Sequence, residues 1–207
     1  MPSLEAFFGL TCPVCGGELD APGVCTACRE RIVPARRGGG VYLGRYRALA
    51  GLVRAVKYRE HRLALTWAAE RLAARVAATP WPLEAVVFVP TFPWRALSRG
   101  VYAPRVLAEE IAKRLGLPLL PALVRVRYTA SQTRRRERRK LPQVFLATRR
   151  VPRVVLLADD VFTSGATFFR AAEALAARGA EEVYGAFLAV ADPKGLAALP
   201  YNPSHQR

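Results

Sequence analysis

The segment 154–167, VVLLADDVFTSGAT, constrains the fold of this chain more than any other segment. It opens with Val154–Leu157, a β-branched and aliphatic run of the length that a buried strand takes. Two carboxylates follow, Asp159 and Asp160, and then a turn of small and hydroxyl-bearing residues. Residues 168–178 have helical composition and stop before a glycine that suits a left-handed cap. This order of strand, acidic pair, turn and helix predicts a βα unit of an open α/β sheet, with a ligand at the carboxyl end of the strand.

The chemistry of the turn suits an anion, and that of the acidic pair suits a sugar. The turn consists of Thr163, Ser164, Gly165, Ala166 and Thr167. Free N–H groups and the dipole at a helix N-terminus favour an anion, and small residues let a phosphate approach the backbone. Asp159 and Asp160 would repel that phosphate, but they suit vicinal hydroxyls of a sugar, or Mg²⁺, which prefers oxygen ligands. A ribose 5-phosphate meets both demands; the alternative is an ordinary βα turn without a ligand.

All cysteines of the chain lie in residues 12–28, CPVCGGELDAPGVCTAC. They form two Cys-x2-Cys pairs, Cys12 with Cys15 and Cys25 with Cys28. Two such pairs can present four thiolates to one tetrahedral ion, and the glycines and prolines between them supply turns. Disulfides are the poorer interpretation for a cytoplasmic chain, and a redox pair would not need a second copy. We therefore expect a structural Zn²⁺ that supplies the folding energy which so small a core lacks.

The charge balance points to phosphate-rich partners. The chain has 32 Lys and Arg against 16 Asp and Glu, a formal charge of +16, and arginine suits bidentate phosphate recognition. The alternative is a composition that is Arg-rich through GC-rich coding. Residues 125–140, RVRYTASQTRRRERRK, are the most basic segment and predict an exposed loop. Arg134, Arg135 and Arg136 are candidate nucleic-acid contacts, with Tyr128 available to stack on a base. The alternative is a disordered, solvated segment that binds no partner.

The apolar strand, acidic pair and T-[ST]-G-[AG]-T turn resemble the ribose-phosphate-binding motif of type I phosphoribosyltransferases. The resemblance implies that Asp159 and Asp160 bind the ribose 2′- and 3′-hydroxyls and that residues 163–167 bind the 5′-phosphate. It also implies that the basic segment is a lid over phosphoribosyl pyrophosphate, which binds together with Mg²⁺. The candidate pyrophosphate-binding residues are Thr91, Arg99 and Gly100, after an apolar strand at 86–89, and Arg138 of the basic segment.

A second resemblance covers nearly the whole chain. A four-Cys module precedes VKYRE at 56–60, SRG at 98–100 and then Gln132 to Phe145, which is similar to the order in ComF-type competence proteins. Lys140 stands where that family commonly has Asn, and Val101-Tyr102-Ala103 replaces Phe-Asn-Gln. The resemblance implies a cytoplasmic protein of natural transformation that handles incoming single-stranded DNA together with the competence machinery.

These patterns predict two units. Residues 1–38 would form a small zinc-ribbon-like module, with a flexible boundary at 33–40. Residues 39–207 would form a type I phosphoribosyltransferase-like α/β domain with a mainly parallel sheet and flanking helices, ending in a peripheral tail from 192. Besides the strands at 86–89 and 154–157, strands are expected at 41–45, 119–126 and 182–190, and helices at 47–58, 64–78 and 104–115.

The predicted setting is the cytoplasm, without membrane insertion. The first ten residues lack the features of a signal peptide, and no apolar run approaches the length of a membrane span. Three functions stay open at this point: transfer of a 5-phosphoribosyl group, single-stranded DNA binding without catalysis, and regulation by sensing the phosphoribosyl donor.

Overall fold

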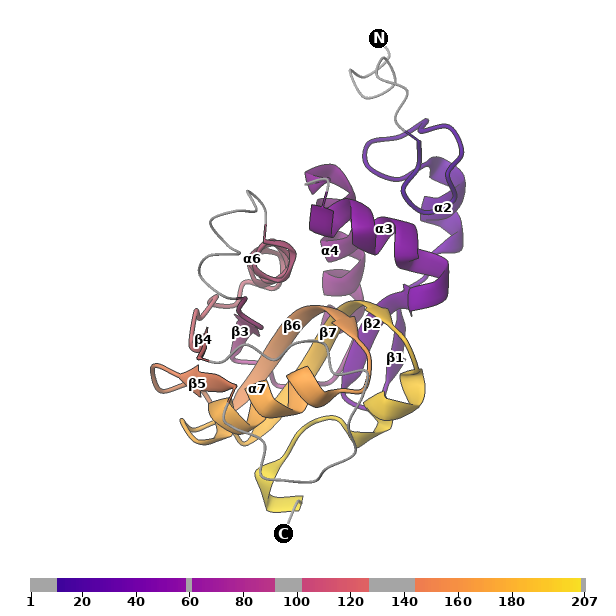
Figure 1. Cartoon of the computed structure of the whole chain (residues 1–207). Coiled ribbons are helices and arrows are strands. Elements are labelled where there is room, and N and C mark those ends of the chain that lie inside the picture. The colour runs from indigo at the N-terminus through magenta and orange to yellow at the C-terminus, as the bar shows by residue number, and fades with distance from the viewer. Residues whose placement is uncertain (1–10, 59–60, 92–101, 127–143, 206–207) are drawn as a thin grey trace.

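A computed structural model describes residues 11–58, 61–91, 102–126 and 144–205. Its centre is a five-stranded sheet of order β1-β2-β7-β6-β3 (Figure 1). Four strands run parallel, and β1 is an antiparallel edge strand. The strands are β1 (Ala35–Arg37), β2 (Gly40–Arg45), β3 (Ala85–Phe88), β6 (Val154–Phe162) and β7 (Glu182–Val190). The predicted α/β fold with a mainly parallel sheet is confirmed.

Helices cover both faces of the sheet, with α3, α4 and α6 on one face and α7 on the other (Figure 1). A hydrophobic core lies on each face of the sheet. Alternate residues of β6 pack into one core or the other, because successive side chains of a strand point to opposite faces. Leu156 and Ala158 pack under α3, α4 and α6, whereas Val155 and Leu157 pack under α7. The helices are α2 (Thr26–Arg31), α3 (Tyr46–Tyr58), α4 (Arg62–Ala77), α6 (Ala103–Leu115), α7 (Ala166–Ala176) and the 3-10 helices η1 (Pro193–Ala198) and η2 (Pro203–His205).

The strands expected at 41–45, 86–89 and 182–190 and the helices expected at 47–58, 64–78 and 104–115 are present, with ends that differ by at most two residues. The strand expected at 154–157 is longer than predicted. It continues through the acidic pair to Phe162, because β7 pairs with it as far as the Phe162–Val190 register. The acidic pair therefore belongs to a strand rather than to the loop that follows.

The strand expected at 119–126 is wrong in extent and in partner. Only β4 (Leu123–Arg125) is a strand, and it pairs antiparallel with β5 (Phe145–Ala147) in a separate two-stranded ribbon. Leu119 forms a single bridge with Val86 at the edge of the main sheet. Pro121 has no N–H to continue that ladder, so the chain leaves the sheet there.

Of two segments that the sequence placed at the margins of the domain, one joins the sheet and the other joins the core. Residues 33–40, interpreted as a boundary, include β1, which pairs with β2. The tail from 192 is not peripheral: its apolar residues Leu196, Leu199 and Tyr201 are buried, and Tyr201 bridges to β7. Apolar side chains between the prolines of the tail thus complete the core beneath α7. In the described parts of the chain, no helix combines the length and the apolar character that crossing a membrane requires.

Candidate functional site

The carboxyl ends of β3 and β6 meet at one edge of the parallel sheet. Phe88 lies opposite Ala158, and the Val89 N–H donates to the Ala158 carbonyl at 3.0 Å. Asp159 therefore lies beside the start of the loop that follows β3. This is the edge at which open α/β sheets bind ligands, because side chains from several loops converge there.

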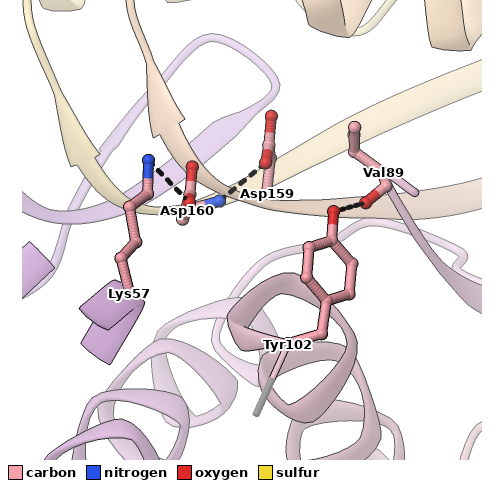
Figure 2. A network of polar contacts seen from close by, with 5 residues as sticks. All are labelled: Lys57, Val89, Tyr102, Asp159 and Asp160. Atoms are coloured by element: carbon pink, nitrogen blue, oxygen red, sulfur yellow. Dashed lines mark hydrogen bonds and ion pairs between the residues drawn. The ribbon is translucent and has the colours of Figure 1, made fainter. Parts of the chain in front are cut away.

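The acidic pair is tied to α3 by an ion pair (Figure 2). Lys57, in the last turn of α3, places its Nζ 2.8 Å from Asp160 Oδ2. Burial works to lower the pKa of Lys57, but the charge of Asp160, its hydrogen bond and the charge of Asp159 together outweigh burial, and the pKa is raised. The ammonium group therefore stays charged and offsets one of the two adjacent carboxylates. Lys57 links the helix after β2 to the strand at the centre of the site.

Asp159 is the more deeply buried acid, with 8% of its surface exposed. Its Oδ1 accepts the N–H of Asp160 at 2.8 Å. Burial and then the neighbouring charge of Asp160 raise the pKa of Asp159 well above its ordinary value, whereas Lys57 and Arg125 act in the opposite direction. The two carboxylates thus differ in environment, although the sequence presents them as a symmetrical pair.

The raised pKa of Asp159 has a consequence for stability. Between the ordinary carboxyl pKa and the raised value, the native state binds more protons than the unfolded state, so the free energy of unfolding falls as pH rises. Asp159→Asn keeps an oxygen for the Asp160 N–H and removes the charge. We expect it to raise the free energy of unfolding at pH 7 by at least about 1 kcal/mol, since one pKa unit corresponds to about 1.4 kcal/mol.

Urea denaturation of both proteins between pH 4 and pH 8 measures this effect. The two stability curves should converge at low pH and separate as pH rises. Glu173→Gln, an equal change of charge at an exposed position of α7, is the matched control and should leave the shape of the curve unchanged. Parallel curves for wild type and Asp159→Asn would contradict the assignment.

The turn after β6 presents the N-terminus of α7 to solvent. Thr163, Ser164 and Thr167 are exposed, and the N-cap residue Gly165 has no side chain to cap the helix. The Ser164 Oγ accepts the N–H of Ala166, the first residue of α7, at 3.5 Å. Gly165 has a φ of 81°, which L-residues with a Cβ rarely adopt. A small cavity borders Asp159, Thr163 and Thr167 together, so the structure brings the acidic strand and the turn to one place. The arrangement offers N–H groups and hydroxyls to an anion directly beside a carboxylate.

The remaining candidates are placed only in part. Thr91 is half-buried at the carboxyl end of β3, on the same edge as the acidic pair. Arg99, Gly100 and Arg138 lie outside the described residues, as do the candidate nucleic-acid contacts Arg134, Arg135 and Arg136. The Tyr102 hydroxyl donates to the Val89 carbonyl and so joins α6 to the end of β3 (Figure 2).

The basic segment leaves the described structure from the β4–β5 ribbon. The Arg125 guanidinium carbon lies 5.5 Å from the centre of the Phe145 ring, a cation–π contact across the two paired strands. The charge of Arg125 also acts to lower the pKa of Asp159. The positive charge at the start of the Arg-rich segment therefore acts on the acidic pair.

The four cysteines gather into one cluster. Their Sγ atoms all lie within 4.8 Å of one another, and Cys15 Sγ is 3.7 Å from Cys25 Sγ. A tetrahedral ion with Zn–S bonds of about 2.3 Å would hold its sulfurs about 3.8 Å apart. Cys12, Cys25 and Cys28 are buried, whereas Cys15 is exposed. The sulfur-only donor set and its spacing fit a structural Zn²⁺ or a similar thiophilic ion.

The thiols of this cluster are not equivalent. Burial opposes ionisation of Cys12, but hydrogen bonds from the backbone N–H groups of Cys15, Cys25 and Val14 and from the Cys25 thiol together outweigh it and lower its pKa to about 7. Burial and then the neighbouring thiols raise the pKa of Cys28 to about 12. An ion bound here must displace the Cys28 proton, so metal affinity should fall with decreasing pH.

Three residues of this region did not stand out in the sequence. Lys57 belongs to the VKYRE segment that carried the second resemblance, but nothing in its spacing indicated an ion pair with Asp160. Tyr102 appeared only as a departure from a family pattern. Arg125 was one of many arginines in a basic run. Each acquires its role from contacts between elements that are distant in the sequence.

No protein-family model and no curated protein matches this chain. Solved structures similar to it include the glutamine phosphoribosylpyrophosphate amidotransferase from B. subtilis complexed with ADP and GMP, at 20% identity and a TM-score of 0.41. Two others are the adenine phosphoribosyl transferase from Trypanosoma brucei in complex with AMP, pyrophosphate and ribose-5-phosphate (15%, TM-score 0.43) and the adenine phosphoribosyltransferase from Leishmania tarentolae (14%, TM-score 0.44).

The matches cover 60%, 70% and 77% of this chain, and 26%, 61% and 95% of the respective structures. The chain thus spans about a quarter of the length of the B. subtilis protein. With TM-scores below 0.5, these similarities are too loose to assign a ligand or an activity to this chain.

Proposed function

We propose that the β6–α7 region binds phosphoribosyl pyrophosphate or another ribose 5-phosphate ligand. One observation carries the proposal: the exposed N-terminus of α7 follows the acidic end of β6 at the carboxyl edge of the sheet. A helix N-terminus favours a phosphate, and carboxylates accept hydrogen bonds from sugar hydroxyls. A ligand with both groups, joined by the length of a ribose, satisfies the two halves of the site.

The acidic pair is assigned to the ribose diol. Asp159 Oδ1 and Asp160 Oδ2 are already engaged, with the backbone and with Lys57. In the part of the chain that the structure covers, Asp159 Oδ2 and Asp160 Oδ1 have no hydrogen-bond partner and can accept the 2′- and 3′-hydroxyls. Thr163, Ser164, Gly165, Ala166 and Thr167 are assigned to the 5′-phosphate.

The reaction class that suits this ligand is transfer of the 5-phosphoribosyl group. The bond from C1 of the ribose to pyrophosphate breaks, the pyrophosphate takes the electron pair, and an acceptor nucleophile forms the new bond to C1. Thr91, Arg99, Gly100 and Arg138 are assigned to the departing pyrophosphate. Mg²⁺ bound with the donor would supply further neutralisation of its charge. Asp159 and Asp160 would stabilise the positive charge that develops on the sugar.

Isothermal titration with phosphoribosyl pyrophosphate and Mg²⁺ tests the proposal. We expect Asp160→Asn to weaken binding by at least about tenfold, because a hydrogen bond to a charged group is worth about 1.5–3 kcal/mol. Glu173→Gln serves as the control for the change in charge. Absence of binding by the wild-type protein, or equal affinity in Asp160→Asn, would remove the proposed site.

A second function is contact with single-stranded DNA during natural transformation. The formal charge of +16 and the many arginines of residues 125–140 support it. In this proposal the protein is a cytoplasmic, ComF-type partner of the competence machinery, with a zinc module at 1–38 and a transferase-like domain at 39–207. Arg134, Arg135 and Arg136 would contact the phosphates, so that affinity depends steeply on salt.

A further inference from the structure

An open groove of about 1030 Å³ runs between the first cysteine pair and α3. One wall is the turn of residues 11–16, which carries Cys12 and Cys15. The other wall is α3, and residues 61–63 at the start of α4 close one end. Figure 1 shows the cysteine-bearing loops next to α3, away from the sheet. The groove is separate from the turn at 163–167, which contributes nothing to its lining.

The groove carries uncompensated positive charge. Arg47 and Arg54 lie two turns apart on one face of α3, about 10 Å along the helix axis. Arg62 adds a third guanidinium from the first residue of α4. All three are exposed, and none has an ion-pair or hydrogen-bond partner among the described residues. The described lining includes no Asp or Glu.

The lining of the groove also includes small and aromatic residues. Ala48 and Ala50 line it between the arginines, where their small side chains leave room for a partner, whereas the space over Gly51 is filled by the Pro13 carbonyl, with which an added Cβ would collide. Tyr58, which is 66% exposed, and the half-buried His61 also line the groove. Spaced guanidinium groups with planar rings beside them match a chain of phosphates with bases between.

We propose that this groove binds a single-stranded nucleic acid. The proposal rests on the nucleic-acid contact proposed above and assigns it a second surface, distinct from the Arg-rich segment. An open trough suits a polymer that enters at one end and leaves at the other, whereas a small ligand is normally enclosed on most sides. Arginine recognises phosphate bidentately, and exposed Tyr58 offers a face on which a base can stack.

Fluorescence anisotropy with a labelled oligothymidylate of twenty nucleotides, measured at several salt concentrations, tests the proposal. The groove variant is Arg47→Ala/Arg54→Ala. The matched control is Arg36→Ala/Arg37→Ala, which removes the same charge from exposed positions of β1. We expect the groove variant to lose at least about tenfold in affinity at low salt. The negative slope of log K against log salt should become less steep by about 1.4, which is about 0.7 for each lost phosphate contact. The control should bind within about twofold of wild type.

Two further variants separate the outcomes. Tyr58→Ala should weaken binding about tenfold if a base stacks there. Equal binding by the groove variant and its control, with loss of affinity in Arg134→Ala/Arg135→Ala/Arg136→Ala, would overturn the groove and leave the nucleic-acid function intact. No binding by the wild-type protein would overturn both. Unchanged affinity in Tyr58→Ala, together with displacement of the oligonucleotide by polyglutamate at equal charge, would identify an acidic peptide as the partner instead.

Discussion

Chelation of the Zn²⁺ that we expect at the cysteine cluster should unfold the N-terminal part of the chain. Structural Zn²⁺ contributes about 10–16 kcal/mol to the folding of small zinc peptides at neutral pH, far more than the few apolar residues here can replace. Leu19 and Val24 are buried in the same core as α3 and α4. Gly23 approaches α4 so closely that an added Cβ would lie 2.5 Å from the Ala64 nitrogen. Loss of the ion should therefore also expose part of the main core.

The measurement is thermal unfolding with and without a chelator, together with metal analysis of the purified protein. We expect about one equivalent of zinc, a lower and broader transition after chelation, and recovery when zinc is returned. Cys28→Ser should reproduce the chelated state, whereas Val33→Ser, at a position 73% exposed, should not. Metal-free protein with the same transition as the metal-treated protein would exclude a structural ion.

Replacement of Gly165 by Val is expected to have the second large effect. The φ of 81° costs a residue with a Cβ about 1–2 kcal/mol. The new Cβ would lie 2.7 Å from Phe169 Cε2 and 2.8 Å from Phe162 Cζ. Phe162 packs against Phe187 and Phe168 in the core, so it has little room to move. Overpacking of this kind typically costs about 1–3 kcal/mol more. We expect a total of about 2–5 kcal/mol and loss of ribose-phosphate binding.

Gly116→Ala is the control that separates strain from collision. Gly116 has a similar φ of 66°, but nothing lies within 4 Å of an added Cβ. It should lose about 1 kcal/mol, with binding unchanged. Chemical denaturation gives the two stabilities, and titration with the phosphoribosyl donor gives the affinities. If Gly165→Val and Gly116→Ala unfolded at the same denaturant concentration and bound equally well, the turn would have no special packing and no part in the site.

The local patterns of the sequence were sufficient to predict most elements. Apolar runs identified three of the four parallel strands nearly to the residue, since a strand buried on both faces must be apolar along its length. The spacing of the cysteines indicated their cluster for a similarly local reason. The predicted strands were wrong where pairing with a neighbouring strand decides which residues belong to the sheet. β6 extends through two acids because β7 continues beside it, and the segment from Leu119 leaves the main sheet because Pro121 interrupts the ladder.

What the sequence alone determined is the order of chemical groups in two short stretches, the acidic strand with its turn and the cysteine pairs. Both depend on neighbours within one βα unit or one loop. The tertiary structure decided which distant groups meet them: Lys57 on Asp160, Arg125 near Asp159, and the cysteine-bearing turn against α3. These contacts depend on the strand order and on the helix faces turned toward one another. The spacing of residues along the chain does not predict contacts between elements that are distant in the sequence.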